Sequence, residues 1–202
     1  MCARSNLLRG HGNARPLRYS DMAVHISAAR DDLEGLEALA PVWAEWHGHH
    51  RELAEHPECW DDLDASWLAR LDWYQRLLLD GASYVTATDD EGRVVGYAVV
   101  AMNDGRDDRG DVEARIGEVV TLVVKSDRRS AGVGRALLRA AEGIARERGF
   151  DTVKVVVVSR NRRVQDFYEA SGYALGEHVL YRSLGDWQTA SVVPCRRRRS
   201  FS

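Results

Sequence analysis

The stretch that decides the fold reads EVVTLVVKSDRRSAGVGRALL, residues 118–138. Its apolar, valine-rich first part predicts a strand from about 118 to 125. A polar loop, 126–131, follows, and Gly132 and Gly134 open a segment whose apolar residues have helical spacing through about residue 148. Glycines here let the backbone approach a ligand closely, and the free N–H groups at the helix start attract phosphate. The stretch therefore predicts a strand, a loop and a helix that together can bind a phosphate group.

Two common glycine-loop motifs do not fit this stretch. A dinucleotide-binding GxGxxG motif needs a third glycine where Leu137 stands, and it follows the first strand of its fold, whereas this loop comes late. A P-loop needs Gly-Lys-Ser or Gly-Lys-Thr, which is absent. Taken alone, the loop is equally compatible with a structural turn that binds nothing.

The rest of the chain predicts an α/β protein with a mixed, mostly antiparallel sheet and helices on both faces. The expected order is β-α-α-β-β-β-α-β-α-β-β. Pro41 should bend or split the first helix, which opens at Asp31-Asp32. The continuous apolar run 153–158 predicts a central strand buried on both faces. The other expected elements are strands at 23–29, 83–88, 93–102, 173–176 and 179–184, and helices at 65–79 and from Asn161 to near Gly172.

The bulk composition narrows the function classes. The net charge is −3, so the whole molecule has no electrostatic reason to favour nucleic acid. No run approaches the roughly 18 apolar residues of a membrane helix. The cysteines, Cys2, Cys59 and Cys195, are far apart and form no CxxC pair, which argues against a zinc site or a disulfide framework and favours a cytoplasmic location.

The chain divides into one domain with two unlike ends. Residues 22–185 read as a single unit, residues 1–21 as a disordered extension, and residues 186–202 as a disordered basic tail. The Arg-rich, acid-poor start leaves a transit peptide open, and Met22 could be the true initiator. The arginines at 196–199 could contact phosphates, but a solvated tail is the simpler reading.

Two motifs in this order resemble the signatures of the GNAT N-acetyltransferase superfamily. Arg129-x-x-Gly132-x-Gly134 resembles its acyl-CoA motif, Arg/Gln-x-x-Gly-x-Gly/Ala. Downstream, the Asn161, Phe167-Tyr168 and Gly172-Tyr173 positions resemble its second signature. The resemblance covers about residues 23–184 and is strongest over 118–173. At three positions this chain differs from the residue that is common in the family's motifs: Ser126 replaces Pro, Ser130 replaces Gly and Val164 replaces Ala. These differences are small.

The resemblance implies acetyl-CoA as co-substrate and no metal. Main-chain N–H groups of the loop and helix start should bind the CoA pyrophosphate, and the strand edge should pair with the pantetheine arm. The N–H of Val124 should also polarise the thioester carbonyl. The implied cofactor-binding residues are Leu122, Val123, Val124, Arg129, Ser130, Ala131, Gly132, Val133, Gly134, Arg135, Asn161 and Phe167.

Two residues match the family's acid and base. Glu118 matches a general-base glutamate, and strand alternation would put it on one face with Val120, Leu122 and Val124. Tyr168 matches the general-acid tyrosine that protonates the departing thiolate. The plainer alternatives are a solvated strand glutamate and a core tyrosine.

The acceptor is expected to be a primary amine of a small molecule or peptide, and a homodimer stays open. The first two helices are rich in tryptophan and histidine, with several acids nearby. Aromatic rings and acids would suit a cationic amine, although core tryptophans beside a solvated acidic turn explain the pattern as well. The closely spaced His47, His49 and His50 do not share one helical face, which argues against metal. The alternative function is that of a binding module: a sensor that binds acyl-CoA without catalysis.

Overall fold

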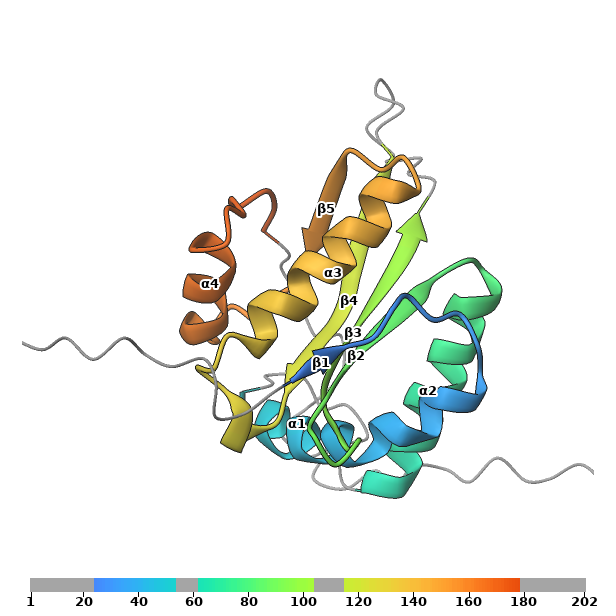
Figure 1. Ribbon diagram of the computed structural model, residues 1–202. Helices are drawn as coiled ribbons and strands as arrows, with labels where there is room; N and C mark the ends of the chain where they lie inside the picture. Colours follow the sequence, from blue (N-terminus) through green and yellow to red (C-terminus); the bar gives the residue numbers. More distant parts are fainter. Residues whose placement is uncertain (1–23, 54–61, 104–114, 179–202) are drawn as a thin grey trace, which may run out of the picture.

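In the computed structural model, the described residues are 24–53, 62–103 and 115–178, with the side chains of 49–53 and 103 left aside. They form one sheet with the strand order β1-β2-β3-β4-β5 (Figure 1). The first four strands pair antiparallel, and β4 and β5 pair parallel. The strands are β1 His25–Ile26, β2 Ser83–Thr88, β3 Val94–Asn103, β4 Ile116–Val124 and β5 Thr152–Val155.

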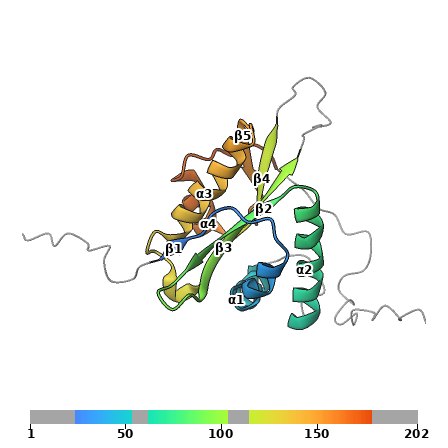
Figure 2. The same cartoon turned by 45° about the vertical axis from the view of Figure 1, so that its right-hand side comes forward.

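Helices cover both faces of the sheet. Figure 2 shows α1 and α2 on one side and α3 and α4 on the other. The elements are η1 Glu34–Leu39, α1 Ala40–Leu53, α2 Leu63–Leu79, η2 Ser126–Arg128, α3 Val133–Glu147 and α4 Arg162–Glu169, of which η1 and η2 are 3-10 helices. The mixed sheet with helices on both faces confirms the expected fold class. Within the described ranges, no helix has both the length and the apolar character needed to cross a membrane.

Each face of the sheet has its own apolar core. On the α1/α2 face, Leu36, Leu39 and Leu71 pack against alternate residues of β3 and β4. On the α3/α4 face, Leu137, Leu138 and Ala141 pack against the other set of strand residues. Because side chains alternate across a strand, β3 contributes Tyr97, Val99 and Ala101 to the first core and Ala98 and Val100 to the second.

Local signals explain most helix boundaries. Pro41 is the second residue of α1, directly after the 3-10 helix η1, so the change in the helix expected at Pro41 is present. The expected start at Asp31-Asp32 was wrong, because the helical stretch begins at Glu34. Asp62 caps α2 by accepting a hydrogen bond from the N–H of Ala65 at 3.0 Å. Gly149, at φ +77°, follows α3 and ends the helix, as glycine commonly does at this position.

Two strand predictions were wrong. Strand β5 covers only 152–155, and the expectation that the run 153–158 is buried on both faces was wrong. Thr152 and Lys154 are exposed, and Val156 is 75% exposed. A valine run alone does not show that a strand is buried on both faces. Residues 173–176 form no strand, and 179–184 lie outside the described residues, as do both chain ends.

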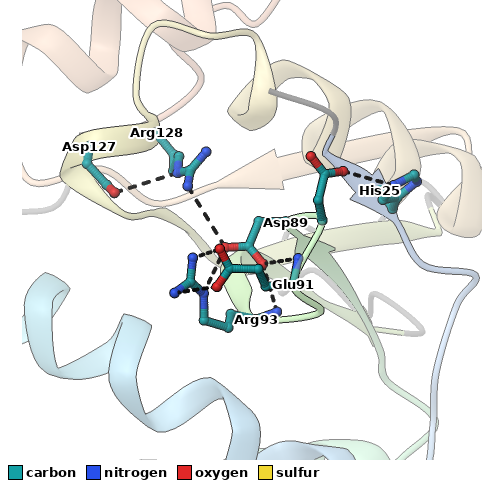
Figure 3. A network of polar contacts seen from close by, with 7 residues as sticks. His25, Asp89, Glu91, Arg93, Asp127 and Arg128 are labelled. Carbon is teal, nitrogen blue, oxygen red and sulfur yellow. Dashed lines mark hydrogen bonds and ion pairs between the residues drawn. The ribbon is translucent and has the colours of Figure 1, made fainter. Parts of the chain in front are cut away.

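The β2–β3 hairpin is tied to the loop before α3 by a polar network (Figure 3). The Asp89 carboxylate is 7% exposed and accepts hydrogen bonds from the main-chain N–H groups of Arg93 and Glu91, at 2.9 and 3.1 Å. The Arg93 Nε also donates to it at 3.0 Å, and the Arg128 guanidinium lies 3.9 Å away. The hairpin therefore fixes η2, which leads into the glycine loop.

Candidate active site

The start of α3 presents main-chain N–H groups without a side-chain cap. Gly132 is the N-cap residue, in the left-handed region at φ +83°, and no side-chain cap hydrogen bond is present. The first turn holds no acidic residue. The first N–H groups of a helix have no partner within the helix, and the helix dipole makes this end partly positive. The geometry is therefore suited to bind an anion.

The loop before α3 carries a second left-handed residue. Ser130 has φ +65°, and no other non-glycine residue in the described part of the chain has a positive φ. Glycine is favoured at such an angle because it has no Cβ, which accounts for the glycine common at this position of the motif. Ser130, Ala131 and Arg135 are exposed, and Val133 is buried beneath them. The loop therefore follows the geometry of the motif despite this departure.

Beside the loop, β4 has an edge that no described strand covers. The β4–β5 pairing ends at Val119 and Val155, whereas β4 continues to Val124. Lys125 donates its N–H to the carbonyl of Val95 at 2.9 Å, and main-chain groups alternate along an antiparallel strand. The N–H groups of Leu122 and Val124 therefore point away from β3, toward the β5 side.

The β4 residues predicted to bind cofactor are thus not equivalent. Val123 faces Tyr97 in the register and turns its main-chain groups to β3, while its side chain is buried in the α1/α2 core. The carbonyl of Val124 accepts a hydrogen bond from Arg129 Nε at 3.0 Å. Arg129 therefore holds the loop against the end of β4, and the open edge is provided by Leu122 and Val124.

The start of α3, the end of β4 and α4 meet at Gly134. A Cβ added at Gly134 would lie 3.7 Å from Phe167 Cζ and 3.8 Å from Val124 Cγ2. The structure thus brings Phe167 next to the glycine loop, as the two motifs imply. A larger side chain at Gly134 would have to displace one of these neighbours.

A β-bulge at Val120 changes the face on which Glu118 lies. In the β3–β4 register Val100 pairs with Val119 and Val99 with Thr121, so Val120 is the extra residue. Glu118 pairs with Ala101 and therefore points to the α1/α2 face. Leu122 and Val124 pack on the α3/α4 side instead, together with Phe167.

The expectation that Glu118 shares a face with Leu122 and Val124 was therefore wrong. Strict alternation fails because one inserted residue reverses the faces of all residues beyond it. Only Val120, of the three expected neighbours, lies on the same side as Glu118.

Glu118 lies near the end of the segment over which β4 and β5 are paired. It faces Lys154 of β5, whose Nζ is 3.2 Å from the Glu118 carboxylate. The Glu118 side chain is 20% exposed, so solvent or a substrate can reach it. A partly buried carboxylate beside an open strand edge can accept a proton from a neighbouring amine.

Tyr168 belongs to the other face of the sheet. Its ring is 8% exposed and stands edge-on to Phe167 and Tyr173, at centroid distances of 5.1 and 5.3 Å. Burial raises the pKa of Tyr168 to about 12. The Tyr173 hydroxyl donates to Glu142 at 3.1 Å, whereas that of Tyr168 makes no hydrogen bond with the described residues. Tyr168 therefore remains protonated at ordinary pH.

Asn161 is the N-cap of α4. Its Oδ1 accepts a hydrogen bond from the N–H of Val164 at 3.3 Å, which explains why the helix begins there. The side-chain amide of Asn161 keeps its N–H groups available as donors, because a cap uses only the oxygen.

The aromatic cluster between α1 and α2 is filled by the protein's own cation, Arg70. The guanidinium of Arg70 lies 4.3 Å from the ring centre of Trp43 and 4.7 Å from that of Trp73. Trp43 is 1% exposed and belongs to the interior. The rings therefore do not form an empty cage for a cationic amine. Trp60, His56, Glu58 and Asp61 lie outside the described residues, and the side chains of His49 and His50 are not described.

Sequence reasoning missed a buried polar connection between α2 and β4. The Tyr74 hydroxyl donates to Thr121 Oγ1 at 2.8 Å and lies 3.2 Å from the Tyr97 hydroxyl. Tyr74 has no exposed surface, and burial raises its pKa. Threonine inside an apolar strand is the signal that could have indicated a polar partner.

A second missed contact joins α1 to the loop. Glu45 Oε1 accepts a hydrogen bond from the N–H of Ser126 at 2.6 Å. Burial opposes ionisation of Glu45, but hydrogen bonds from Ser126 and the charges of Arg129 and Lys125 outweigh it and lower its pKa. The loop before α3 is thus held by β3, α1 and its own Arg129.

An uncapped helix start beside an open strand edge, on a mixed α/β sheet, is the arrangement expected of a protein that binds an extended phosphorylated cofactor. The model of the acetyltransferase (GNAT) family matches residues 41–173, and the chain belongs to this family.

Curated relatives and solved structures agree with this family. Mycothiol acetyltransferase of Propionibacterium freudenreichii subsp. shermanii is 33% identical over 149 residues, or 72% of this chain and 41% of that protein. The chain thus spans less than half the length of that relative. A putative acetyl transferase from Pyrococcus furiosus matches with a TM-score of 0.61 and 20% identity, covering 80% of this chain and all of that one. An aminoglycoside N-acetyltransferase in complex with CoA matches with a TM-score of 0.57 and 20% identity, over 81% and 97%.

Proposed function

We propose that this protein transfers an acetyl group from acetyl-CoA to a primary amine of a small molecule or peptide, by direct attack in a ternary complex. The observation that carries the proposal is the uncapped start of α3 directly beside the open edge of β4. An anion site next to unpaired strand amides fits a ligand with a diphosphate followed by an amide-containing arm. A bound CoA in a structural neighbour of the same fold supports this choice of ligand.

On the donor side, the main-chain N–H groups of the loop and of the first turn of α3 bind the diphosphate. The edge of β4 at Leu122 and Val124 pairs with the pantetheine arm as an added strand would. The N–H of Val124 points to the same side and stabilises the negative charge that develops on the thioester oxygen, an effect worth about 2.7–4 kcal/mol in other enzymes. The Asn161 side chain donates to the arm from the start of α4.

On the acceptor side, Glu118 removes a proton from the ammonium group so that the amine nitrogen can attack the acetyl carbon. Glu118 lies on the α1/α2 face, where the family resemblance places the acceptor. Lys154 Nζ lies 3.2 Å from the Glu118 carboxylate and holds it in place. The proton is passed from Glu118 to solvent, because the side chain is partly exposed.

When the C–S bond breaks, the thiolate needs a proton, and Tyr168 donates it. The attacking nitrogen loses its extra proton as the amide forms, and this proton restores the Tyr168 hydroxyl through solvent. Burial keeps Tyr168 protonated, and its hydroxyl has no competing partner among the described residues. Tyr168 lies on the α3/α4 face and Glu118 on the opposite one. Donor and acceptor therefore approach from different faces and meet at the edge of β4 beyond its last pairing with β5.

The acceptor is proposed only as a class. The mycothiol acetyltransferases are longer proteins, and this chain matches 41% of the first and second of them. The share of the relative that this chain does not match can contribute to its substrate site. A primary amine is thus proposed as a class, in line with the aminoglycoside N-acetyltransferase among the structural neighbours.

The test is release of free thiol from acetyl-CoA by the purified chain, across polyamines, aminoglycosides, amino acids and peptides with a free N-terminus. We expect amine-dependent thiol release together with an acetylated acceptor detected by mass spectrometry. Binding of acetyl-CoA without turnover on any amine would contradict the catalytic proposal and indicate a non-catalytic acyl-CoA-binding module.

A further inference from the structure

Arg70 of α2 is enclosed by aromatic rings. Its guanidinium carbon lies 4.3 Å from the ring centre of Trp43 and 4.7 Å from that of Trp73. Trp46 and Tyr74 are within 5.8 and 5.7 Å. These rings come from both α1 and α2, so the guanidinium is held between the two helices. Stacking of this kind restricts the side chain and orients its plane.

Among the described residues, the guanidinium of Arg70 has the Tyr74 hydroxyl as a hydrogen-bond partner, and no carboxylate lies within salt-bridge distance of it. Two other arginines do have such a carboxylate: Arg76 pairs with Asp72 at 2.8 Å and Arg30 with Asp32 at 2.8 Å. One hydroxyl cannot occupy all five N–H donors of a guanidinium, and the ring faces interact with its plane, so donors along its edge remain available. Arg70 is only partly buried, so this edge can meet a ligand.

Arg70 is connected to the proposed active site by one residue. Tyr74, one turn further along α2, donates its hydroxyl to Thr121 of β4 at 2.8 Å. Thr121 and Glu118 lie on the same face of β4, on either side of the bulge. The cation is therefore on the α1/α2 side of the sheet, the side to which Glu118 also points.

We infer that Arg70 binds an oxyanion, a carboxylate or a phosphate, that the acceptor carries in addition to its amine; this inference rests on the proposed function. A guanidinium held flat between rings presents a fork of donors that matches a planar carboxylate in a bidentate pair. An anionic group of the acceptor satisfies the charge of Arg70, whereas a polyamine would be repelled by it.

The test compares matched pairs of short peptides with a free N-terminus: a C-terminal acid against its amide, and a phosphoserine peptide amide against its serine counterpart. Binding is measured by calorimetry with CoA present, and kcat/KM by thiol release from acetyl-CoA. We expect at least one anionic member to bind about tenfold or more tightly than its neutral partner. If the C-terminal acid and its amide differ, the bound group is a carboxylate; if the phosphoserine and serine peptides differ, it is a phosphate.

The decisive variant is Arg70→Gln, which should abolish the difference within the pair and leave the affinity for acetyl-CoA unchanged. Arg70→Lys should keep part of this difference in affinity, because lysine keeps the positive charge but lacks the paired N–H donors of a guanidinium. Arg76→Gln, on an exposed arginine of the same helix, should keep all of it. Far-UV circular dichroism of each variant establishes that the fold is retained.

An equal preference in the wild type and in Arg70→Gln overturns the inference, as does the absence of any anion preference in the wild type. Preference in binding without thiol release would uphold the role of Arg70 and refute the proposed activity. Thiol release at the same rate with anionic and neutral peptides would uphold the proposed activity and refute the role of Arg70.

Discussion

Glu118 and Tyr168 differ in their surroundings, and the difference suits the two roles proposed for them. Glu118 is 20% exposed and has Lys154 at 3.2 Å, so water and an acceptor can reach its carboxylate. Tyr168 is 8% exposed and surrounded by rings, so its neutral form is favoured. One residue is thus ready to take a proton and the other to give one.

We expect Glu118→Gln to lower kcat by about 10²–10⁴, the usual contribution of a general base, with little change in the affinity for acetyl-CoA. An amide cannot accept the proton, while the α3 anion site is untouched. Thiol-release kinetics over a range of pH measure this. Glu147→Gln, on an exposed carboxylate at the end of α3, serves as control and should behave as the wild type. A rate for Glu118→Gln that equals the wild type at every pH would reject Glu118 as base.

Tyr168→Phe should lower kcat by about 10²-fold or more, because the ring packing is kept and only the proton donor is lost. Since burial raises the pKa of Tyr168 to about 12, the hydroxyl stays protonated below that pH. The wild-type kcat should therefore show no loss of this acid up to about pH 10. Tyr173→Phe, which removes a neighbouring hydroxyl bound to Glu142, is the matched control. Full activity of Tyr168→Phe would assign Tyr168 to the core alone.

At the scale of elements, α3 combines binding and packing. Its apolar face, with Leu137, Leu138 and Ala141, is buried against the sheet, which fixes the direction of the helix axis. Its first turn is consequently held at the end of β4, with Gly132 turning the chain from the loop into the helix. The anion site is thus positioned by the core and needs no side chain of its own.

Two glycines of this element should respond oppositely to replacement by alanine. Gly132→Ala forces a Cβ onto a backbone at φ +83° and should lower the free energy of unfolding by about 1–2 kcal/mol and raise the KM for acetyl-CoA. Gly143→Ala, in the helix interior with open space around it, should raise that free energy by about 0.5–1 kcal/mol and leave KM unchanged. Denaturant unfolding and steady-state kinetics measure both quantities. A fully stable Gly132→Ala protein with normal KM would contradict the role assigned to the helix start.

At the scale of the whole molecule, charged contacts connect distant parts of the chain around the site. The Asp89 network joins the β2–β3 hairpin to η2, as Figure 3 shows. Asp32 joins the segment after β1 to β2, since it pairs with Arg30 and accepts a hydrogen bond from Tyr84 at 3.3 Å. In both cases the carboxyl has a lowered pKa because hydrogen bonds stabilise its ionised form.

This predicts loss of stability in acid. Hydrogen bonds from Arg93 lower the pKa of Asp89 in the folded state against the opposing effect of burial. Such a carboxylate stabilises the fold above the unfolded pKa of about 3.9, and the stabilisation is lost as pH falls through the folded pKa. Asp89→Asn should therefore lower the Tm at pH 7 and flatten the decline of Tm in acid.

Thermal unfolding from pH 7 down to pH 3 measures this effect. Asp90→Asn, on the adjacent exposed carboxylate, is the control and should leave the curve nearly unchanged. An Asp89→Asn curve that runs parallel to that of the wild type would show that Asp89 does not contribute to the acid response.

The sequence by itself determined what depends on neighbouring residues. The change in the helix at Pro41, the cap at Asn161 and the glycine loop after β4 were all predictable, because chain conformation and helix ends are set within a few residues. The family motifs lie in such local stretches, so the fold class could be predicted too.

Only the tertiary structure decided features that depend on pairing between distant segments. The bulge at Val120 placed Glu118 on the α1/α2 face, and β5 is partly exposed although its sequence resembles a strand buried on both faces. Arg70 became the cation between α1 and α2 only when the helices packed together. Strand register and helix contacts arise from the fit of surfaces far apart in the chain, and no local pattern contains that information.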